Sequence, residues 1–261
     1  MRHIGPALLT VLLAAGSAHA IDHDNIDAGR PLLFEDAISI AYRERAFEIG
    51  AALGFPKQRP VGLGLSAEYL YGFARNSHFS IDFDPSIGGR AGTGDTRADA
   101  GDVGVGLFRS LNRETLGTPA IAVRADVSLP TGRGSRGPQV RLRGILSRTV
   151  RQYSRLHLNA DANIKFRPES GERAVQPSLV LGLTRPLGYP TRFDRTGLAE
   201  IAVRSGEKNG SGAVVSAGIG LRQQVTVRAV FDVGIQSDIG ALGAKTDRTS
   251  LRFVTGYSTQ F

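Results

Sequence analysis

The sequence contains no cysteine, no tryptophan and a single methionine, which stands at position 1. Without cysteine the chain can form neither a disulfide scaffold nor a thiolate metal site. Long apolar runs are also missing, because beyond Ala20 no stretch approaches the roughly 18 to 20 apolar residues of a membrane helix. These absences exclude disulfide-rich secreted domains and argue against membrane-spanning helices after the first 20 residues.

Lysine is scarce, although the net charge is +8. Such a basic balance ordinarily suggests a nucleic-acid partner. Here the arginines are scattered along the chain, without interleaved aromatic residues, zinc-finger spacing or a recognition helix. We therefore expect no nucleic-acid partner, and a basic rim would instead meet anionic lipid head groups.

The first 20 residues, "MRHIGPALLTVLLAAGSAHA", have the pattern of a secretory signal peptide. Arg2 is the basic start, an apolar stretch follows from Ala7 to Ala15, and Ala18-His19-Ala20 has the small-x-small form of a cleavage site. The alternative, an uncleaved membrane anchor, is disfavoured by the short apolar run and by Pro6. The mature chain is thus expected to begin at Ile21.

One pattern recurs along the mature chain, in which apolar and polar side chains alternate. In "VGLGLSAEYLYGF" the residues from Val61 to Phe73 place apolar side chains on one face and glycine, serine or glutamate on the other. "AIAVRADVSL", "RLHLNADANIKF" and "VTVRAVFDVGIQ" repeat it. These runs are longer than the ~5 to 6 residues of an ordinary strand and match tilted strands that cross a membrane.

The connections between these runs alternate in length, as in outer-membrane barrels. "GGRAGTGDTRADAG" and "RPESGERAVQ" are long and polar, whereas "RNS", "RQYS" and "RQQ" are short turns. The pattern predicts an all-β fold, a transmembrane antiparallel up-and-down β-barrel of about 12 strands over residues 46–261, with ten or fourteen strands as alternatives. The expected strands are 46–54, 61–73, 78–86, 101–111, 119–130, 139–150, 155–166, 177–187, 197–207, 213–222, 225–237 and 250–261.

The chain ends in "LRFVTGYSTQF", a strand with one apolar face. Phe253, Tyr257 and Phe261 lie on that face, which would contact lipid if the last strand closed a barrel by pairing with the first. The strand resembles the carboxy-terminal signal that the barrel assembly machinery reads. The alternative, an edge strand of a soluble sandwich, would leave this apolar face and an open edge to be covered elsewhere.

Charged side chains of both signs fall on the opposite, inward face. They indicate either a water-lined conduit or a salt-bridge network that fills the lumen, and we expect a narrow lumen whose charges serve structure more than solute selection. The predicted lumen-facing residues are Glu48, Glu68, Asp82, Arg124, Asp126, Arg141, Arg143, Asp161, Glu200, Arg204, Arg228, Asp232 and Arg252.

Catalytic patterns are weak. His78, Ser80 and Asp82 share a strand face, but side chains at i, i+2 and i+4 stand side by side and do not set a base against a nucleophile. The G-x-G sequences are not followed by a strand-to-helix turn, so they are not phosphate loops. We predict a non-enzymatic protein with no catalytic residue, cofactor or metal ion.

Residues 21–45 precede the predicted barrel and are long for a simple lead-in. "FEDAISIAYRER" is expected to form a short helix with Glu35 and Asp36 in its first turn. On the periplasmic side this segment is a candidate plug, with Arg43 and Arg45 meeting Glu48 or Glu68. A plain disordered tail is the alternative.

"AGDVGVGLFRSL" and "PAIAVRADVSLPTGRG" resemble motifs of the MetA-pathway phenol degradation family of outer-membrane proteins. The matching residues are Gly101, Asp102, Gly104, Gly106, Leu129, Pro130, Thr131 and Gly132. The resemblance implies a barrel that passes small solutes, aromatic or hydrophobic ones among them.

We therefore predict a channel or transporter-like barrel in the bacterial outer membrane. Its expected partners are outer-membrane lipid and lipopolysaccharide, the assembly machinery during biogenesis, and a small-molecule solute. The alternative function is a structural or interaction barrel whose lumen is filled by side chains.

Overall fold

The computed structural model describes residues 30–56, 61–88, 98–133, 135, 137–151, 153–192, 194–243 and 249–261. The predicted signal peptide lies outside these residues. The strands are β1 (Arg45–Pro56), β2 (Gly62–Ala74), β3 (Ser77–Phe83), β4 (Ser86–Gly88), β5 (Ala98–Asp99), β6 (Val103–Asn112), β7 (Ala120–Leu129), β8 (Gln139–Arg151), β9 (Ser154–Lys165), β10 (Val175–Pro186), β11 (Arg195–Ser205), β12 (Ala213–Thr226), β13 (Ala229–Leu242) and β14 (Thr249–Gln260). No helix within this described part of the chain is long and apolar enough to cross a membrane.

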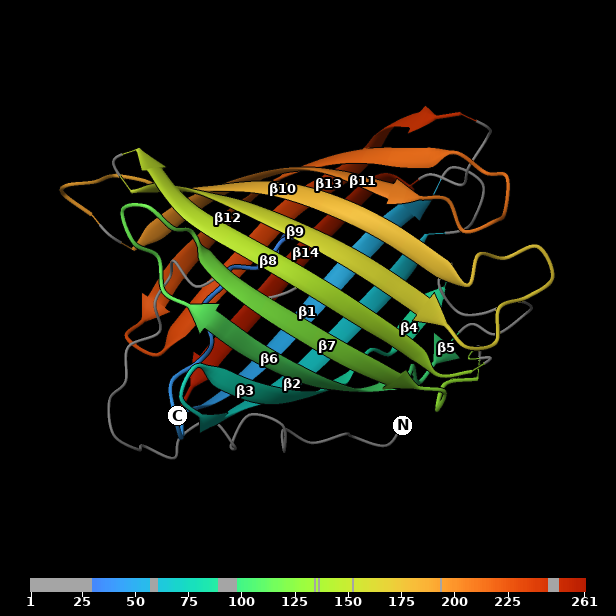
Figure 1. Ribbon diagram of the computed structural model, residues 1–261, viewed down its shortest axis with the longest axis horizontal. Coiled ribbons are helices and arrows are strands. Elements are labelled where there is room, and N and C mark those ends of the chain that lie inside the picture. The colour runs from blue at the N-terminus through green and yellow to red at the C-terminus, as the bar shows by residue number, and fades with distance from the viewer. Residues whose placement is uncertain are drawn as a thin grey trace, which may run out of the picture.

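The strands form one closed antiparallel barrel (Figure 1). Each long strand pairs with its neighbour in sequence, and the last strand, β14, pairs with the first, from Ala46 opposite Gln260 to Pro56 opposite Thr249. Because β1 also pairs with β2, the wall has no free edge along its long strands. Twelve strands make up the wall when the short β4 and β5 are set aside, which confirms the predicted fold and strand count.

The third strand of the wall departs from the expected range of 78–86. It divides into β3 and β4, and both pieces pair with β2. Pro85 lies in the break, where it cannot donate to a ladder, while its carbonyl accepts from Leu65 N at 2.8 Å. The wall therefore continues through the break with a local irregularity.

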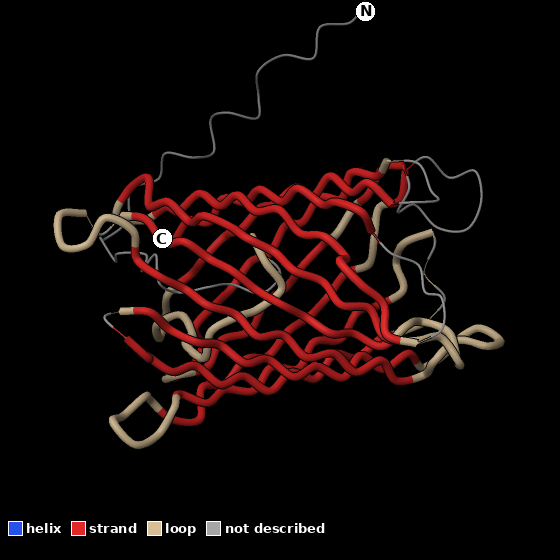
Figure 2. Tube along the Cα trace, turned by 90° about the horizontal axis from the view of Figure 1, so that it is seen from above, coloured by secondary structure: helices blue, strands red, loops and turns tan. Residues whose placement is uncertain are grey.

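The two ends of the barrel differ, and we name them by their connections. The turn end holds the connections within the pairs β2–β3, β6–β7, β8–β9, β10–β11 and β12–β13, and β1 starts and β14 finishes there. At the loop end the connections are longer on the whole, as between β9 and β10 or β3 and β6. Figure 2 shows the oblique strands between these two sets of connections.

The outer wall is apolar and the inner wall polar, as the alternation predicts. On β13, Phe231, Val233 and Ile235 are each about 41 to 42% exposed, whereas Asp232 and Gln236 are buried. The same contrast appears on β10, where Leu179, Leu181 and Leu183 are exposed on the outside. An exposed apolar wall around a buried polar interior is the arrangement that a lipid solvent requires.

The hairpin of β12 and β13 corrects the predicted turn. "RQQ" was expected to be a turn, but Arg222, Gln223 and Gln224 belong to β12, and the chain reverses at Val227 and Arg228. The cause is an inward ion pair, in which Arg222 Nε lies 2.7 Å from Asp232 Oδ1 on the neighbouring strand. Arg228 is therefore a half-buried turn residue at the turn end and not, as predicted, part of the strand 225–237.

Candidate functional site in the barrel lumen

Residues 30–40 run inside the barrel, and residues 41–44 lead from there to β1 at the turn end. The expected helix is absent from these described residues, which have bends and turns in place of helical hydrogen bonding. Both carboxylate oxygens of Asp36 have a partner. Its Oδ1 accepts from Ile38 N at 2.9 Å, and its Oδ2 lies 3.7 Å from Arg155 Nη1. Bonds of this kind between side chains and backbone compete with a helix. The helix prediction is thus wrong, because side-chain contacts of Asp36 take the place of the backbone hydrogen bonds of a helix.

The segment of residues 30–40, called here the inner segment, follows the wall around the lumen. Arg30 contacts β1, and Pro31 receives a hydrogen bond from Gln236 of β13 at 3.2 Å. Leu33 N donates to Glu200 of β11 at 2.7 Å. The contacts thus begin at β1 and proceed in the order in which the strands adjoin one another.

The second half of the inner segment continues along the inner wall, from β9 to β6. Glu35 N donates to Asn159 Oδ1 of β9 at 2.7 Å, and Asn159 Nδ2 donates back to Glu35 O at 2.9 Å. Ala37 N donates to Ser147 Oγ of β8 at 3.1 Å, while Ala37 O accepts from Ser110 of β6 at 2.7 Å. Ile40 then packs with Ala46 and Leu70, back at β1 and β2. The inner segment therefore lines the lumen as a partial ring.

Glycines on the inner wall make room for this ring. A Cβ added at Gly218 would lie 2.9 Å from Leu32, and one at Gly234 would lie 2.8 Å from the carbonyl of Pro31. At Gly182 it would overlap the ring of Phe34. Such close approaches are possible only where the side chain is absent. These glycines, which read as ordinary strand residues in the sequence, act as seats for the inner segment.

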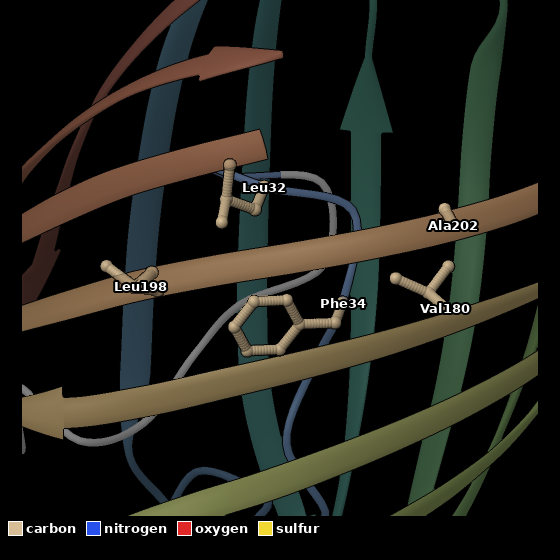
Figure 3. Close-up of a cluster of buried hydrophobic side chains, with 5 residues drawn as sticks. All are labelled: Leu32, Phe34, Val180, Leu198 and Ala202. Carbon is tan, nitrogen blue, oxygen red and sulfur yellow. The ribbon is translucent and has the colours of Figure 1, made fainter. Parts of the chain in front are cut away.

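The middle of the inner segment packs against an apolar patch of the inner wall. Leu32 and Phe34, both fully buried, pack with Val180, Leu198 and Ala202 of β10 and β11 (Figure 3). This cluster anchors an apolar stretch inside an otherwise polar lumen, and full burial of side chains of this kind contributes about 1.5 to 3 kcal/mol each.

His157 of β9 supports the same seat. Its ring stacks on Phe34 with 5.1 Å between centroids. Its Nδ1 lies 2.9 Å from Ser147 Oγ and its Nε2 lies 3.2 Å from Thr184 Oγ1. Ser147 and His157 are completely buried, so this serine and histidine pair is enclosed by the wall and the inner segment.

Glu35 forms the charged part of the site. Its Oε1 lies 3.1 Å from Arg124 Nη1 and its Oε2 lies 3.3 Å from Arg143 Nη1. Arg124 also bonds Asp126 at 2.7 Å and Glu68 at 2.8 Å. These side chains form one continuous network between the inner segment and β2, β7 and β8.

Arg30 holds the beginning of the inner segment against β1. Its guanidinium pairs with Glu48, and its Nη1 donates to Ile49 O at 2.9 Å. The predicted partners of Glu48 and Glu68 are therefore wrong, because Arg30 and Arg124 take the places expected for Arg43 and Arg45. Both of those residues are exposed at the turn end instead.

A polar cavity of about 470 Å³ lies in the lumen beside the ring. Its wall comes mainly from β1, β2, β3, β6, β7 and β8, and Arg30 of the inner segment borders it. The charged side chains of its lining are Arg30, Glu48, Glu68, Asp82, Asp84, Arg124, Asp126, Arg141 and Arg252.

The other predicted lumen residues lie as follows. Asp161 is buried and accepts from Arg143 Nε at 2.5 Å, and Glu200 holds Leu33. Asp232 is buried against Arg222. Arg204, 44% exposed in its side chain, pairs with Asp238 at 2.9 Å and stands apart from the ring. Most of the predicted charges thus meet inside the barrel.

Sequence reasoning missed Arg30, Arg222 and the polar residues that hold the inner segment, Ser110, Ser147, His157 and Asn159. For the strand residues Ser110, Ser147, His157 and Asn159 the sequence signal is a position on an inward face, which many other residues share. Arg30 lies before the first strand and Arg222 was expected in a turn, so alternation gave no signal for either.

The predicted assembly signal lies on the outer wall of β14. Phe253 is 41% exposed and meets Phe55 of β1 edge to face, with 6.0 Å between centroids. Tyr257 is partly exposed, and Phe261 follows the last residue of the strand at 51% exposure. Phe261 N donates to Arg45 O at 3.0 Å, which ties the chain end to β1.

The weak catalytic pattern on β3 has a packing role. His78 stacks on Phe108 with 4.7 Å between centroids, and Ser80 accepts from Arg124 at 3.3 Å. Among the described residues no group of three or more histidine or acidic side chains is arranged to hold a metal ion.

Solved structures with a similar fold include an outer-membrane channel and two porins. The COG4313 outer membrane channel from Pseudomonas putida F1 aligns with a TM-score of 0.68 and 10% identity, covering 91% of this chain and 100% of that one. The NanC porin aligns with a TM-score of 0.58 and 10% identity over 81% and 98% of the two chains. The KdgM porin aligns at 0.52 and 12% over 82% and 99%. No family model and no curated protein matches the sequence.

Proposed function

We propose that this protein is an outer-membrane channel for small polar solutes. The turn end then faces the periplasm and the loop end faces outward, as short periplasmic turns and long outer loops are arranged in such barrels. The exposed apolar wall and the likeness in fold to outer-membrane channels and porins support this proposal.

The observation that carries the proposal is the polar cavity inside the closed wall. It has the size of a small-molecule site, about 470 Å³, and carboxylates and guanidinium groups line it together. Mixed charges favour solutes that are polar or charged, because an apolar solute would desolvate these groups without replacing their hydrogen bonds.

The inner segment is proposed to narrow the channel at its periplasmic half. A lumen enclosed by twelve strands is wider than the filled interior of an eight-stranded barrel and narrower than the channel of a sixteen-stranded porin. A segment of chain along its wall therefore reduces its width substantially. The ring contacts, the glycine seats and the Phe34 cluster support this role. Residues 21–29 of the predicted plug lie outside the described residues.

Kinship with the MetA-pathway phenol degradation family is a further part of the proposal, supported by the motif residues from Gly101 to Gly132. It would extend the solutes to aromatic ones. We also propose that the protein is not an enzyme and that lipid, lipopolysaccharide and the assembly machinery are its partners.

Conductance of the purified full chain in planar bilayers tests the channel. We expect discrete current steps in salt solution and passage of small polar solutes into liposomes. Folded protein, recognised by heat-modifiable gel mobility, that carries neither ions nor solutes would instead indicate the alternative barrel with a filled lumen.

Gly182→Val tests the narrowing. The added side chain overlaps the seat of Phe34, so the inner segment should be displaced and single-channel conductance should rise. Gly144→Val is the matched control, because a Cβ there meets nothing within 4 Å. Equal conductance of the two variants would contradict a narrowing role.

A further inference from the structure

Glu35 is held in a way that resembles a bound ligand more than a wall residue. We propose that the space between Arg124 and Arg143 is a binding site for the carboxylate of a small organic acid, and that Glu35 occupies this site until such an acid displaces it. The consequence for transport rests on the proposed channel function, whereas the binding site itself does not.

The geometry is that of a carboxylate clamp. Each oxygen of Glu35 faces one guanidinium, Oε1 at 3.1 Å from Arg124 and Oε2 at 3.3 Å from Arg143. The three residues are only 4 to 6% exposed. Charge-assisted bonds to both oxygens are the strongest form of carboxylate recognition in proteins.

The clamp is held in place without Glu35. Arg124 Nε bonds Asp126 at 2.7 Å, and Arg143 bonds Asp161 through Nε at 2.5 Å and Nη2 at 3.1 Å. These wall carboxylates fix both guanidinium groups on β7 and β8. A site whose groups are already oriented loses less free energy when a ligand binds.

Departure of Glu35 would leave two buried donors unsatisfied. Within the described residues, Nη1 of Arg124 and Nη1 of Arg143 each bond only to Glu35. Leaving such charged donors without an acceptor costs free energy, and a solute carboxylate removes that cost. Exchange of one carboxylate for another also leaves the charge of the network unchanged.

The clamp adjoins the space that a solute enters. Arg124, with its partners Glu68 and Asp126, forms part of the wall of the polar cavity, while Glu35 approaches from the inner segment. That segment has no strand pairing, and around Glu35 it is held by the backbone of Glu35 to Asn159, by Asp36 to Arg155 and by Ala37 to Ser147 and Ser110. An acid that takes the place of Glu35 removes the two arginine contacts of the inner segment from this set and so loosens the segment at that point.

Acetate binding to the Glu35→Ala variant tests the site. In folded full chain in detergent, calorimetry should show one acetate per barrel, bound at least about tenfold more tightly than by the native chain, in which Glu35 competes. Acetamide, which has the same shape without the charge, should not bind. Arg143→Gln added to Glu35→Ala should abolish acetate binding. Absence of acetate binding to folded Glu35→Ala overturns the proposal.

Thiol labelling tests the displacement in a chain that keeps Glu35. The protein has no cysteine, so Ala37→Cys introduces a unique thiol at a position only 2% exposed. Its labelling by a water-soluble reagent should be slow and should accelerate with acetate, but not with sodium chloride at equal ionic strength. A labelling rate that acetate leaves unchanged overturns the proposed displacement of Glu35. This assay keeps Glu35, so it tests the proposal even if the Glu35→Ala variant does not fold.

The two proposals fail separately. A barrel that binds acetate in these assays but carries no current would overturn the channel function and keep the site. A barrel that conducts but binds no acetate would overturn the binding site and keep the channel function.

Discussion

At the scale of single residues, the lumen is stabilised by charges that cannot be replaced one at a time. Arg222 and Asp232 are at most 1% exposed and bond through two pairs of atoms, at 2.7 and 3.0 Å. Arg204 makes the same kind of pair with Asp238, but its side chain is 44% exposed. The two arginine–aspartate pairs therefore differ in the burial of the arginine, and the Arg204 pair has a single bond through Nη2 to Asp238, whose side chain is buried.

Arg222→Gln should lower the free energy of unfolding by about 3 to 5 kcal/mol, because it leaves Asp232 buried without its cation. Arg204→Gln is the control and should cost less than about 1 kcal/mol, since the guanidinium of this pair is half exposed and water screens its charge. Denaturant unfolding of the two variants in detergent measures both values. Similar losses would show that burial does not set the contribution of these pairs.

At the scale of elements, the β12 and β13 hairpin decides which side chains lie at mid-membrane. Phe231 follows the turn by only a few residues, whereas Ile235 lies near the middle of β13 and opposite Ile219 and Phe253. Strand alternation identifies the outward face, but the depth of each residue depends on where the turn falls.

Ile235→Arg should therefore cost about 2 to 4 kcal/mol of folding free energy in lipid, because a charge on the outer wall at mid-membrane is poorly solvated. Val227→Arg, in the turn and 61% exposed, should cost about 0 to 1 kcal/mol. Reversible unfolding from vesicles compares the variants. A larger loss of folding free energy for Val227→Arg than for Ile235→Arg would contradict the position of this turn at the membrane surface.

At the scale of the whole molecule, closure by β1 and β14 removes the free edge along the wall. The last strand therefore has two tasks, to pair with β1 and, in the proposal, to present an aromatic signal to the assembly machinery. Phe261 lies after the last ladder pair and is exposed, so it contributes little to packing.

Phe261→Ala should reduce the amount of folded barrel in the outer membrane of an expressing bacterium severalfold, while the stability of barrel refolded in detergent stays unchanged. Phe83→Ala removes another exposed aromatic, 40% exposed on β3, and should leave the amount of folded barrel in the membrane unaffected. Heat-modifiable mobility of membrane fractions quantifies folded protein. Loss of refolded stability in Phe261→Ala would assign the residue to packing instead.

The fold could be predicted because its determinants are local. Alternation of side chains, strand length and the contrast between connections are visible in one segment at a time, and they place the wall and its inward charges. The same rule misplaced Arg228, since polar residues such as Arg222 to Gln224 occur both in turns and on an inner wall. Which of the two they form depends on a partner, Asp232, that only pairing reveals.

The sequence by itself determined the closed barrel, its outward apolar face and the inward position of most charges, because these follow from period and composition. Only the tertiary structure decided the path of residues 30–40, since this segment has no repeating pattern and its partners come from strands between β1 and β13. The glycine seats, the His157 contacts and the Glu35 clamp exist only after the wall has closed. They depend on distances across the lumen, which no local sequence pattern encodes.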